Sequence, residues 1–213
     1  MFGSWGLVQP RMVDPRLALA GRKESILPEG ARHDVFDTNV LDTPAGSEVA
    51  YLALGCFWGA EKLYWNTPGV TNTAVGYMGG FTPNPTYEEA YSGRTGHTET
   101  VRVTHDPAQV SYDELLRIFF ENHDPTQGMR QGNDIGTQYR SAIFTTSPEQ
   151  ADAAAEALRR YGQAFEEAGY GAVSTEVVDE PTPFFPAEAY HQQYLVKVPN
   201  GYCPIHATGV TCG

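Results

Sequence analysis

The chain has 213 residues, of which 41% are hydrophobic, enough for one domain with a proper core, with or without an extension. Its formal net charge of −12 argues against nucleic acids and anionic membrane surfaces as partners. Three cysteines do not make a secreted disulfide framework, and no run approaches the ~20 apolar residues of a membrane span. We therefore expect a cytoplasmic thiol protein.

Residues 1–45 carry four prolines and several glycines without any sustained hydrophobic period. Such a stretch predicts an irregular arm that wraps a single catalytic domain formed by residues 46–213. Charged residues and prolines interrupt every apolar run near the N-terminus, so we do not expect a secretory signal there.

A strand-to-helix junction opens the domain. Residues 49–54 are all apolar, which predicts a strand buried on both faces, and residues after Gly55 predict a helix that Pro68 ends. Cys56 lies at this junction, with Phe57 and Trp58 as an apolar wall. Free amide N–H groups and the helix dipole favour an anion there, so we expect a lowered pKa and a reactive thiolate. The alternative is a buried structural cysteine.

The next elements surround a glycine-rich loop. Residues 70–77 and 99–105 predict strands, and the loop between them, residues 76–96, has room for one short helical turn at residues 87–91. Ser111 and Glu114 form a capping box that predicts a helix as far as Asp124.

A second glycine-rich loop, residues 124–138, precedes the remaining elements. They are a strand at residues 139–145, a helix from Ser147 to Gly169, a strand at 174–178, a helix at 187–197 and a coil tail at 199–213. The order from residue 49 to residue 145 is β-α-β-β-α-β. It predicts an α+β fold: a two-layer sandwich with a ferredoxin-like core, a mixed sheet, extra C-terminal helices and a long tail.

Two groups of residues leave alternatives open. Glu99 begins a predicted strand and is either a solvated edge charge or a carboxyl that burial keeps protonated. Cys203 and Cys212 lie in the tail and are either idle thiols, resolving thiols for Cys56, or metal ligands together with His206.

Seven segments, in order and without large gaps between about residue 41 and residue 203, resemble the A-type peptide methionine sulfoxide reductases. They are GCFWG (55–59), GYMGG (76–80), PNPTY (83–87), GRTGHTE (93–99), NHDP (122–125), GTQYRS (136–141) and YHQQYL (190–195).

The resemblance implies reduction of methionine S-sulfoxide, free or in proteins, since each reductase class handles one epimer. Cys56 would attack the sulfoxide sulfur as a thiolate. A protonated Glu99, with the hydroxyls of Tyr87 and Tyr139, would hydrogen-bond the sulfoxide oxygen. The substrate-binding residues implied are Phe57 and Trp58 around the ε-methyl group, with Asp134 and His191.

The resemblance also implies that Cys203 condenses with the Cys56 sulfenic acid and that Cys212 exchanges this disulfide onward to thioredoxin. It implies a monomer that needs no metal or organic cofactor. The tail departs from the family pattern. In family members with two resolving cysteines, the segment between them is typically glycine-rich, whereas Gly209 is the one glycine between Cys203 and Cys212 here. This departure puts the reach of Cys212 in doubt.

Two rival functions remain open from the residues alone. A cysteine hydrolase would use Cys56 as nucleophile and a histidine as base, and would turn over an ester or amide without a reductant. A metal-binding module would use Cys203, His206 and Cys212, and would retain zinc after purification.

Overall fold

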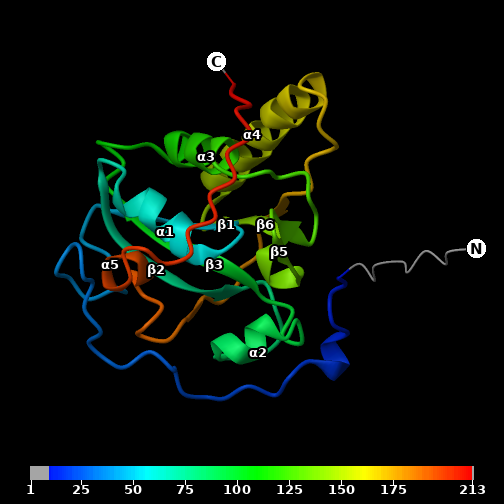
Figure 1. Cartoon of the computed structure of the whole chain (residues 1–213). Coiled ribbons are helices and arrows are strands. Elements are labelled where there is room, and N and C mark those ends of the chain that lie inside the picture. The colour runs from blue at the N-terminus through cyan, green and yellow to red at the C-terminus, as the bar shows by residue number, and fades with distance from the viewer. Residues whose placement is uncertain (1–9, 213) are drawn as a thin grey trace, which may run out of the picture.

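The structure is a computed structural model that describes residues 10–212; residues 1–9 of the predicted arm lie outside the described part. Its centre is a six-stranded mixed sheet in the order β7-β6-β1-β3-β2-β8 (Figure 1). The strands are β1 (Glu48–Leu54), β2 (Val70–Met78), β3 (Thr98–His105), β6 (Ser141–Phe144), β7 (Glu176–Val178) and β8 (Phe185–Pro186), with a separate hairpin of β4 (Arg130–Gln131) and β5 (Asp134–Ile135). The helices are α1 (Phe57–Trp65), α2 (Tyr87–Tyr91), α3 (Tyr112–Glu121), α4 (Pro148–Glu167) and α5 (Tyr194–Lys197), with 3-10 turns η1 (Pro15–Leu17) and η2 (Thr137–Tyr139).

Four central strands and two helices form the predicted βαββαβ unit. Strands β6, β1, β3 and β2 are neighbours in that order and pair antiparallel, and α1 and α3 connect them along the chain. Strand β7 adds to β6 in parallel, which makes the sheet mixed. The α+β class predicted from the sequence is thereby confirmed. None of the described helices is long and apolar enough to cross a membrane.

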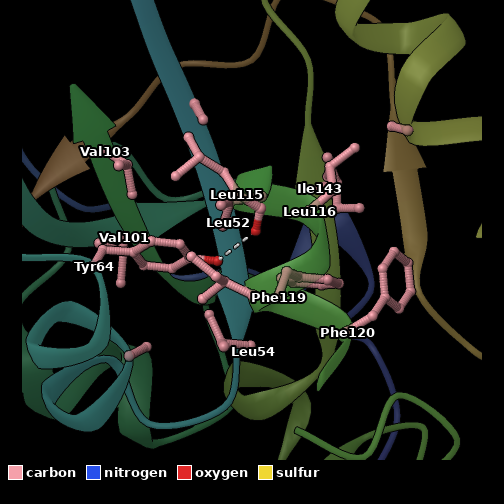
Figure 2. Close-up of a cluster of buried hydrophobic side chains, with 14 of the residues drawn as sticks. Leu52, Leu54, Tyr64, Val101, Val103, Leu115, Leu116, Phe119, Phe120 and Ile143 are labelled. Carbon is pink, nitrogen blue, oxygen red and sulfur yellow. Dashed lines mark hydrogen bonds between the residues drawn. The ribbon is translucent and has the colours of Figure 1, made fainter. Parts of the chain in front are cut away.

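The main core lies between one sheet face and helices α1, α3 and α4 (Figure 2). Leu52 of β1 and Leu115 and Phe119 of α3 are each fully buried. Burying one such side chain contributes roughly 1.5–3 kcal/mol. The hydroxyl of Tyr64 on α1 donates a 3.3 Å hydrogen bond to the Leu115 carbonyl, so the two helices are joined by a polar contact inside the core.

The other sheet face is also covered, although polar residues (Thr100, Arg102 and Thr104) alternate with valines along residues 99–105. Every residue of β3 is buried. Leu27 and Val40 from the arm pack on Ala74 of β2. Arg102 of β3 turns its guanidinium to the hydroxyls of Thr43 and Thr104, at 2.5 and 2.9 Å. The arm therefore covers this face of the sheet, and Arg102 of β3 forms its hydrogen bonds beneath the arm.

Several element boundaries differ from those expected, and two of the differences bear on the site. The helix predicted at residues 187–197 is wrong for its first half, because α5 begins only at Tyr194 and Gln193 before it has a left-handed backbone (φ 46°, ψ 43°). The strand expected from Tyr139 begins at Ser141, since Tyr139 ends the η2 turn.

The C-terminal tail is packed against the domain in the described residues up to 212. It runs from beside α1 towards α3 and α4 (Figure 1). Val210 joins the main core, and the Tyr170 hydroxyl donates a 3.4 Å hydrogen bond to the Thr208 carbonyl. The tail thus has one apolar anchor and one polar anchor near its end.

Candidate active site

Cys56 forms the N-cap of α1, directly after β1. The turn depends on Gly55, whose φ is 99°, and whose Cβ, if present, would lie 2.7 Å from the Gln131 side chain. A side chain is therefore excluded at residue 55 both by backbone strain and by space. The result is a cysteine that is only 8% exposed, held at the start of a helix.

Glu99 lies beside this helix start. It is 3% exposed on the central strand β3, and its Oε2 accepts a 2.9 Å hydrogen bond from the backbone N–H of Phe57. Burial raises the pKa of Glu99 to about 8, the Phe57 N–H opposes this rise, and the nearby Asp134 charge adds to it. The carboxyl is thus mostly protonated at neutral pH, and the alternative of a solvated edge charge is wrong.

The expected lowering of the Cys56 pKa is also wrong for the free protein. Burial raises the pKa of the thiol well above its usual value, and the charge of Glu99 raises it further. The backbone N–H groups of Trp58 and Gly59 act in the opposite direction and are outweighed. The helix N-terminus therefore does favour the thiolate, but desolvation of a buried sulfur is the larger effect. Cys56 rests as a thiol.

Tyr87 and Tyr139 bring two hydroxyls to the same place from α2 and η2. Burial, followed by the charge of Glu99, raises the pKa of both phenols, and Cys56 contributes a smaller rise to each. Both phenols therefore lie within electrostatic reach of Glu99 and Cys56. Both phenols stay protonated and can donate hydrogen bonds.

Aromatic rings form one wall of the site. The indole N–H of Trp58 donates a 3.0 Å hydrogen bond to Nδ1 of His191, and the Tyr194 ring stacks on Trp58 at 4.1 Å. Phe57 and Tyr87 contact His191 with ring centroids 5.4 and 4.5 Å apart. Burial lowers the pKa of His191 to about 4, so the ring is neutral, and its acceptor Nδ1 places the proton on Nε2. His191 here supports the wall.

Asp134 lies on β5, at the polar side of the site. Its Oδ1 accepts a 3.1 Å hydrogen bond from the Tyr202 hydroxyl, while Oδ2 is buried without a hydrogen-bond partner. Burial raises the pKa of Asp134, and the bond from Tyr202 opposes that rise. A buried acceptor without a partner is unusual and is a feature that functional sites share.

The two tail cysteines lie in different places. A Cβ on Gly59 would lie 3.5 Å from the Cys203 sulfur, so Cys203 sits on the first turn of the helix that Cys56 caps. Cys212 packs against the main core, where burial raises its pKa, Arg160 lowers it, and Glu121 and Glu167 add to the rise. These residues belong to α3 and α4, away from the Cys56 site. All three cysteines are free.

The structure weighs against both rival functions. His206 lies against Gly132, far along the tail from Cys212, and the described residues contain no cluster of three ligands that could hold a metal ion. Within the described part of the chain, no histidine hydrogen-bonds Cys56, as a cysteine hydrolase would require. The carboxyl of Glu99 and the phenols of Tyr87 and Tyr139 lie near the thiol, where a hydrolase would have a histidine.

Three tyrosines of the site were not singled out from the sequence. Tyr194 stacks on Trp58, Tyr202 binds Asp134, and Tyr77 pairs with Glu99 across β2 and β3 with its hydroxyl buried and unpartnered. Tyr77 and Tyr194 do lie inside the GYMGG and YHQQYL segments, so that resemblance could have pointed to them. Tyr202 had only its position beside Cys203 as a signal.

Comparison with known proteins agrees with this chemistry. The family model described as peptide methionine sulfoxide reductase matches residues 48–211. The curated relatives include "Peptide methionine sulfoxide reductase MsrA" of Streptomyces griseus, 55% identical over 95% of this chain and 92% of its own, and that of Rhodospirillum centenum, 57% identical over 92% and 89%.

Solved structures agree as well. Methionine sulfoxide reductase A of Corynebacterium diphtheriae is 50% identical, with a TM-score of 0.86 over 96% of this chain and 99% of its own. Reduced Mxr1 of Saccharomyces cerevisiae is 30% identical, with a TM-score of 0.69 over 86% and 99%. Mxr1 is also known in complex with Trx2.

Proposed function

The chain belongs to the peptide methionine sulfoxide reductase family and is an enzyme that reduces methionine sulfoxide; from this premise we propose that Cys56 is its nucleophile and Glu99 its proton donor. One observation carries the proposal. The backbone N–H next to Cys56, that of Phe57, holds one oxygen of the buried Glu99 at 2.9 Å. A thiol and a protonated carboxyl therefore share one small, desolvated space, as attack on a sulfoxide requires.

In the first step, the Cys56 sulfur attacks the sulfur of methionine S-sulfoxide while Glu99 gives its proton to the sulfoxide oxygen. The hydroxyls of Tyr87 and Tyr139 hydrogen-bond the same oxygen. The proton leaving the Cys56 thiol returns to Glu99. The substrate's sulfur–oxygen bond then breaks while an oxygen–sulfur bond to Cys56 forms. The bond between the two sulfurs breaks as well, its electron pair stays on the methionine sulfur, and methionine departs from a Cys56 sulfenic acid. No group outside the site is consumed in this step.

The raised pKa of Cys56 fits this sequence of proton transfers. Protonated Glu99 is neutral, so it no longer raises the pKa of Cys56 by its charge. Burial keeps Glu99 in this form at neutral pH. The form of Glu99 that can protonate the substrate is thus also the form that does not disfavour the Cys56 thiolate by its charge.

The substrate lies between two walls of opposite character. Phe57 and Trp58 take the ε-methyl group on the aromatic side, and Asp134, whose Oδ2 is buried without a hydrogen-bond partner, forms the polar side. His191 acts by holding Trp58 through the indole N–H. These contacts serve free methionine sulfoxide and methionine sulfoxide in a protein chain alike.

Cys203 then attacks the sulfenic acid, a disulfide with Cys56 forms, and water leaves. The place of Cys203 on the first turn of α1 supports this assignment. Cys212 receives the disulfide in a second exchange, and thioredoxin reduces it; the Mxr1 complex with Trx2 supports that partner. Thiols alone carry both electrons, so the proposed reaction uses no metal or organic cofactor. We propose that the enzyme is a cytoplasmic monomer.

The test is a reaction without reductant. Reduced protein is mixed with methionine S-sulfoxide, and methionine formed and thiols lost are counted, with Cys56→Ser as the control. We expect two thiols lost per methionine in the wild type and no methionine from the folded variant. Methionine release by Cys56→Ser would remove Cys56 from its assigned role.

A further inference from the structure

Glu61 is a fully buried carboxyl to which the reaction above gives no task. It lies on α1, three residues after Trp58, and is 0% exposed. Its carboxylate accepts three hydrogen bonds: from the Thr73 hydroxyl at 2.9 Å, from the Gln193 backbone N–H at 2.8 Å and from the Gln193 side-chain amide at 2.6 Å. Such a group is costly to bury, and its three donors all come from outside its own helix.

Gln193 donates two of the three hydrogen bonds that Glu61 accepts. Its backbone is left-handed, which strains any residue that has a Cβ. Its N–H and its amide NH2 both donate to Glu61, and its amide oxygen accepts from the backbone N–H of Asp34 at 3.3 Å. The strained conformation is therefore held by contacts that need the carboxylate.

The segment of residues 191–194, here called the 191–194 corner, also carries part of the aromatic wall. His191 accepts the indole N–H of Trp58, and Tyr194 stacks on the Trp58 ring at 4.1 Å. Trp58 and Glu61 lie one turn apart on α1. Helix α1 thus contacts the 191–194 corner at two points, through the ring of Trp58 and through the carboxylate of Glu61.

The hydrogen-bond chain behind Thr73 fixes which way each proton points. Nδ1 of His33 accepts from the N–H groups of Val35 and Phe36, so its proton is on Nε2 and is directed to the Thr73 hydroxyl at 2.8 Å. The Thr73 hydrogen is then free only for Glu61. All three hydrogen-bond partners of Glu61 are donors. A glutamine at this position would therefore place its NH2 group against at least one of these donors.

We propose that Glu61 is a positioning residue of the reductase: its carboxylate holds the 191–194 corner against α1 and thereby sets Trp58 to receive the methyl group of the substrate. The part concerning the substrate rests on the proposed function. The part concerning Trp58 does not, because it can be measured in the free protein.

The test compares Glu61→Gln with Thr73→Val. The second variant removes a donor to Glu61 but leaves both Gln193 contacts, so it is a control for loss of stability alone. The readout is the NMR resonance of the Trp58 indole N–H, which reports its hydrogen bond to His191. The chain has three tryptophans, and Trp58→Phe identifies the signal. Spectra are recorded about two pH units above the Glu61 pKa of about 7, where the carboxylate is ionised.

We expect Glu61→Gln to move the Trp58 resonance towards that of an indole free of hydrogen bonds. KM for methionine S-sulfoxide should rise about threefold to tenfold, as for loss of one aromatic contact, with kcat almost unchanged. Thr73→Val should lower thermal stability without moving the resonance or KM. Adding Gln193→Glu to Glu61→Gln returns a carboxylate to the pair and should restore the resonance and most of the KM.

The proposal is overturned if Glu61→Gln leaves the Trp58 resonance in place, if Thr73→Val moves it equally, or if the double variant restores nothing. Should Glu61→Gln not fold, Gln193→Gly replaces it, since glycine accepts the left-handed backbone and only the side-chain contact is lost. That variant must move the resonance in the same direction, or the proposal fails. Failure of the wild type to release methionine would refute the proposed function and leave the Trp58 measurement standing.

Discussion

Replacing Glu99 by glutamine or by alanine separates hydrogen-bond donation from simple packing. The Phe57 N–H holds Oε2 of Glu99, so the proton of the neutral acid is on Oε1. In Glu99→Gln the amide oxygen can keep the Phe57 contact while NH2 takes the place of the O–H. Glu99→Ala has no donor. Losing one preorganised donor costs about 3 kcal/mol, or roughly 150-fold in rate, so alanine should lose about that much and glutamine less.

The pH dependence of the two rates gives the sharper result. The Glu99 pKa is raised to about 8, so the acid donates below that pH and is ionised above it. Ionised Glu99 also raises the pKa of Cys56, so both changes slow the wild type as pH rises. Glu99→Gln has neither change. The ratio of wild-type to Glu99→Gln second-order rate constants should be constant below about pH 8 and fall about tenfold per pH unit above it.

The assay is rapid-quench release of methionine in a single turnover, from about pH 6.5 to about pH 9.5, which reports the groups of the free enzyme. Circular dichroism at each pH checks that all three proteins stay folded. A ratio that is equal at both ends of this range would refute the role of Glu99 as the acid. Equal, near-wild-type rates for glutamine and alanine would refute it as well.

Three further variants examine the steps after methionine release. Cys203→Ser should still release about one methionine per enzyme without reductant, then keep a sulfenic acid that mass spectrometry detects as one added oxygen; a normal disulfide yield would contradict this. Cys212→Ser should form the Cys56–Cys203 disulfide normally but turn over slowly with thioredoxin, and a wild-type steady-state rate would make Cys212 an idle thiol. Gly59→Ala should slow disulfide formation, because its methyl group would lie 3.1 Å from Ile205 and 3.5 Å from Cys203; stopped-flow thiol loss at the wild-type rate would contradict the placement of the tail.

Local patterns predicted the elements that position the nucleophile. Six apolar residues followed by Gly55 are enough to predict β1 and the start of α1, since strand length, turn and helix period are all properties of neighbouring residues. The short helix predicted at residues 87–91 has the bounds of α2, and the structure shows that a local capping box between Thr86 and Glu89 begins it.

Contacts between distant segments could not be predicted in this way. The helix expected at residues 187–197 failed because Gln193 binds Glu61, 132 positions earlier, and takes a left-handed backbone that no local propensity favours. The prediction of a lowered Cys56 pKa was wrong for a similar reason. The helix N-terminus can be predicted from the sequence, whereas the burial of Cys56 and its proximity to Glu99 depend on the assembled sheet. Burial decides the sign of such shifts.

The resting state of Cys56 has a consequence for survival of the enzyme itself. Methionine sulfoxide forms where peroxides are abundant, and a peroxide oxidises an exposed thiolate onward to sulfinic and sulfonic acids that thioredoxin does not repair. Cys56 is buried and rests as a thiol, so peroxides meet a poor nucleophile behind an aromatic wall. Burial and protonation of Cys56 thereby limit its irreversible oxidation between turnovers.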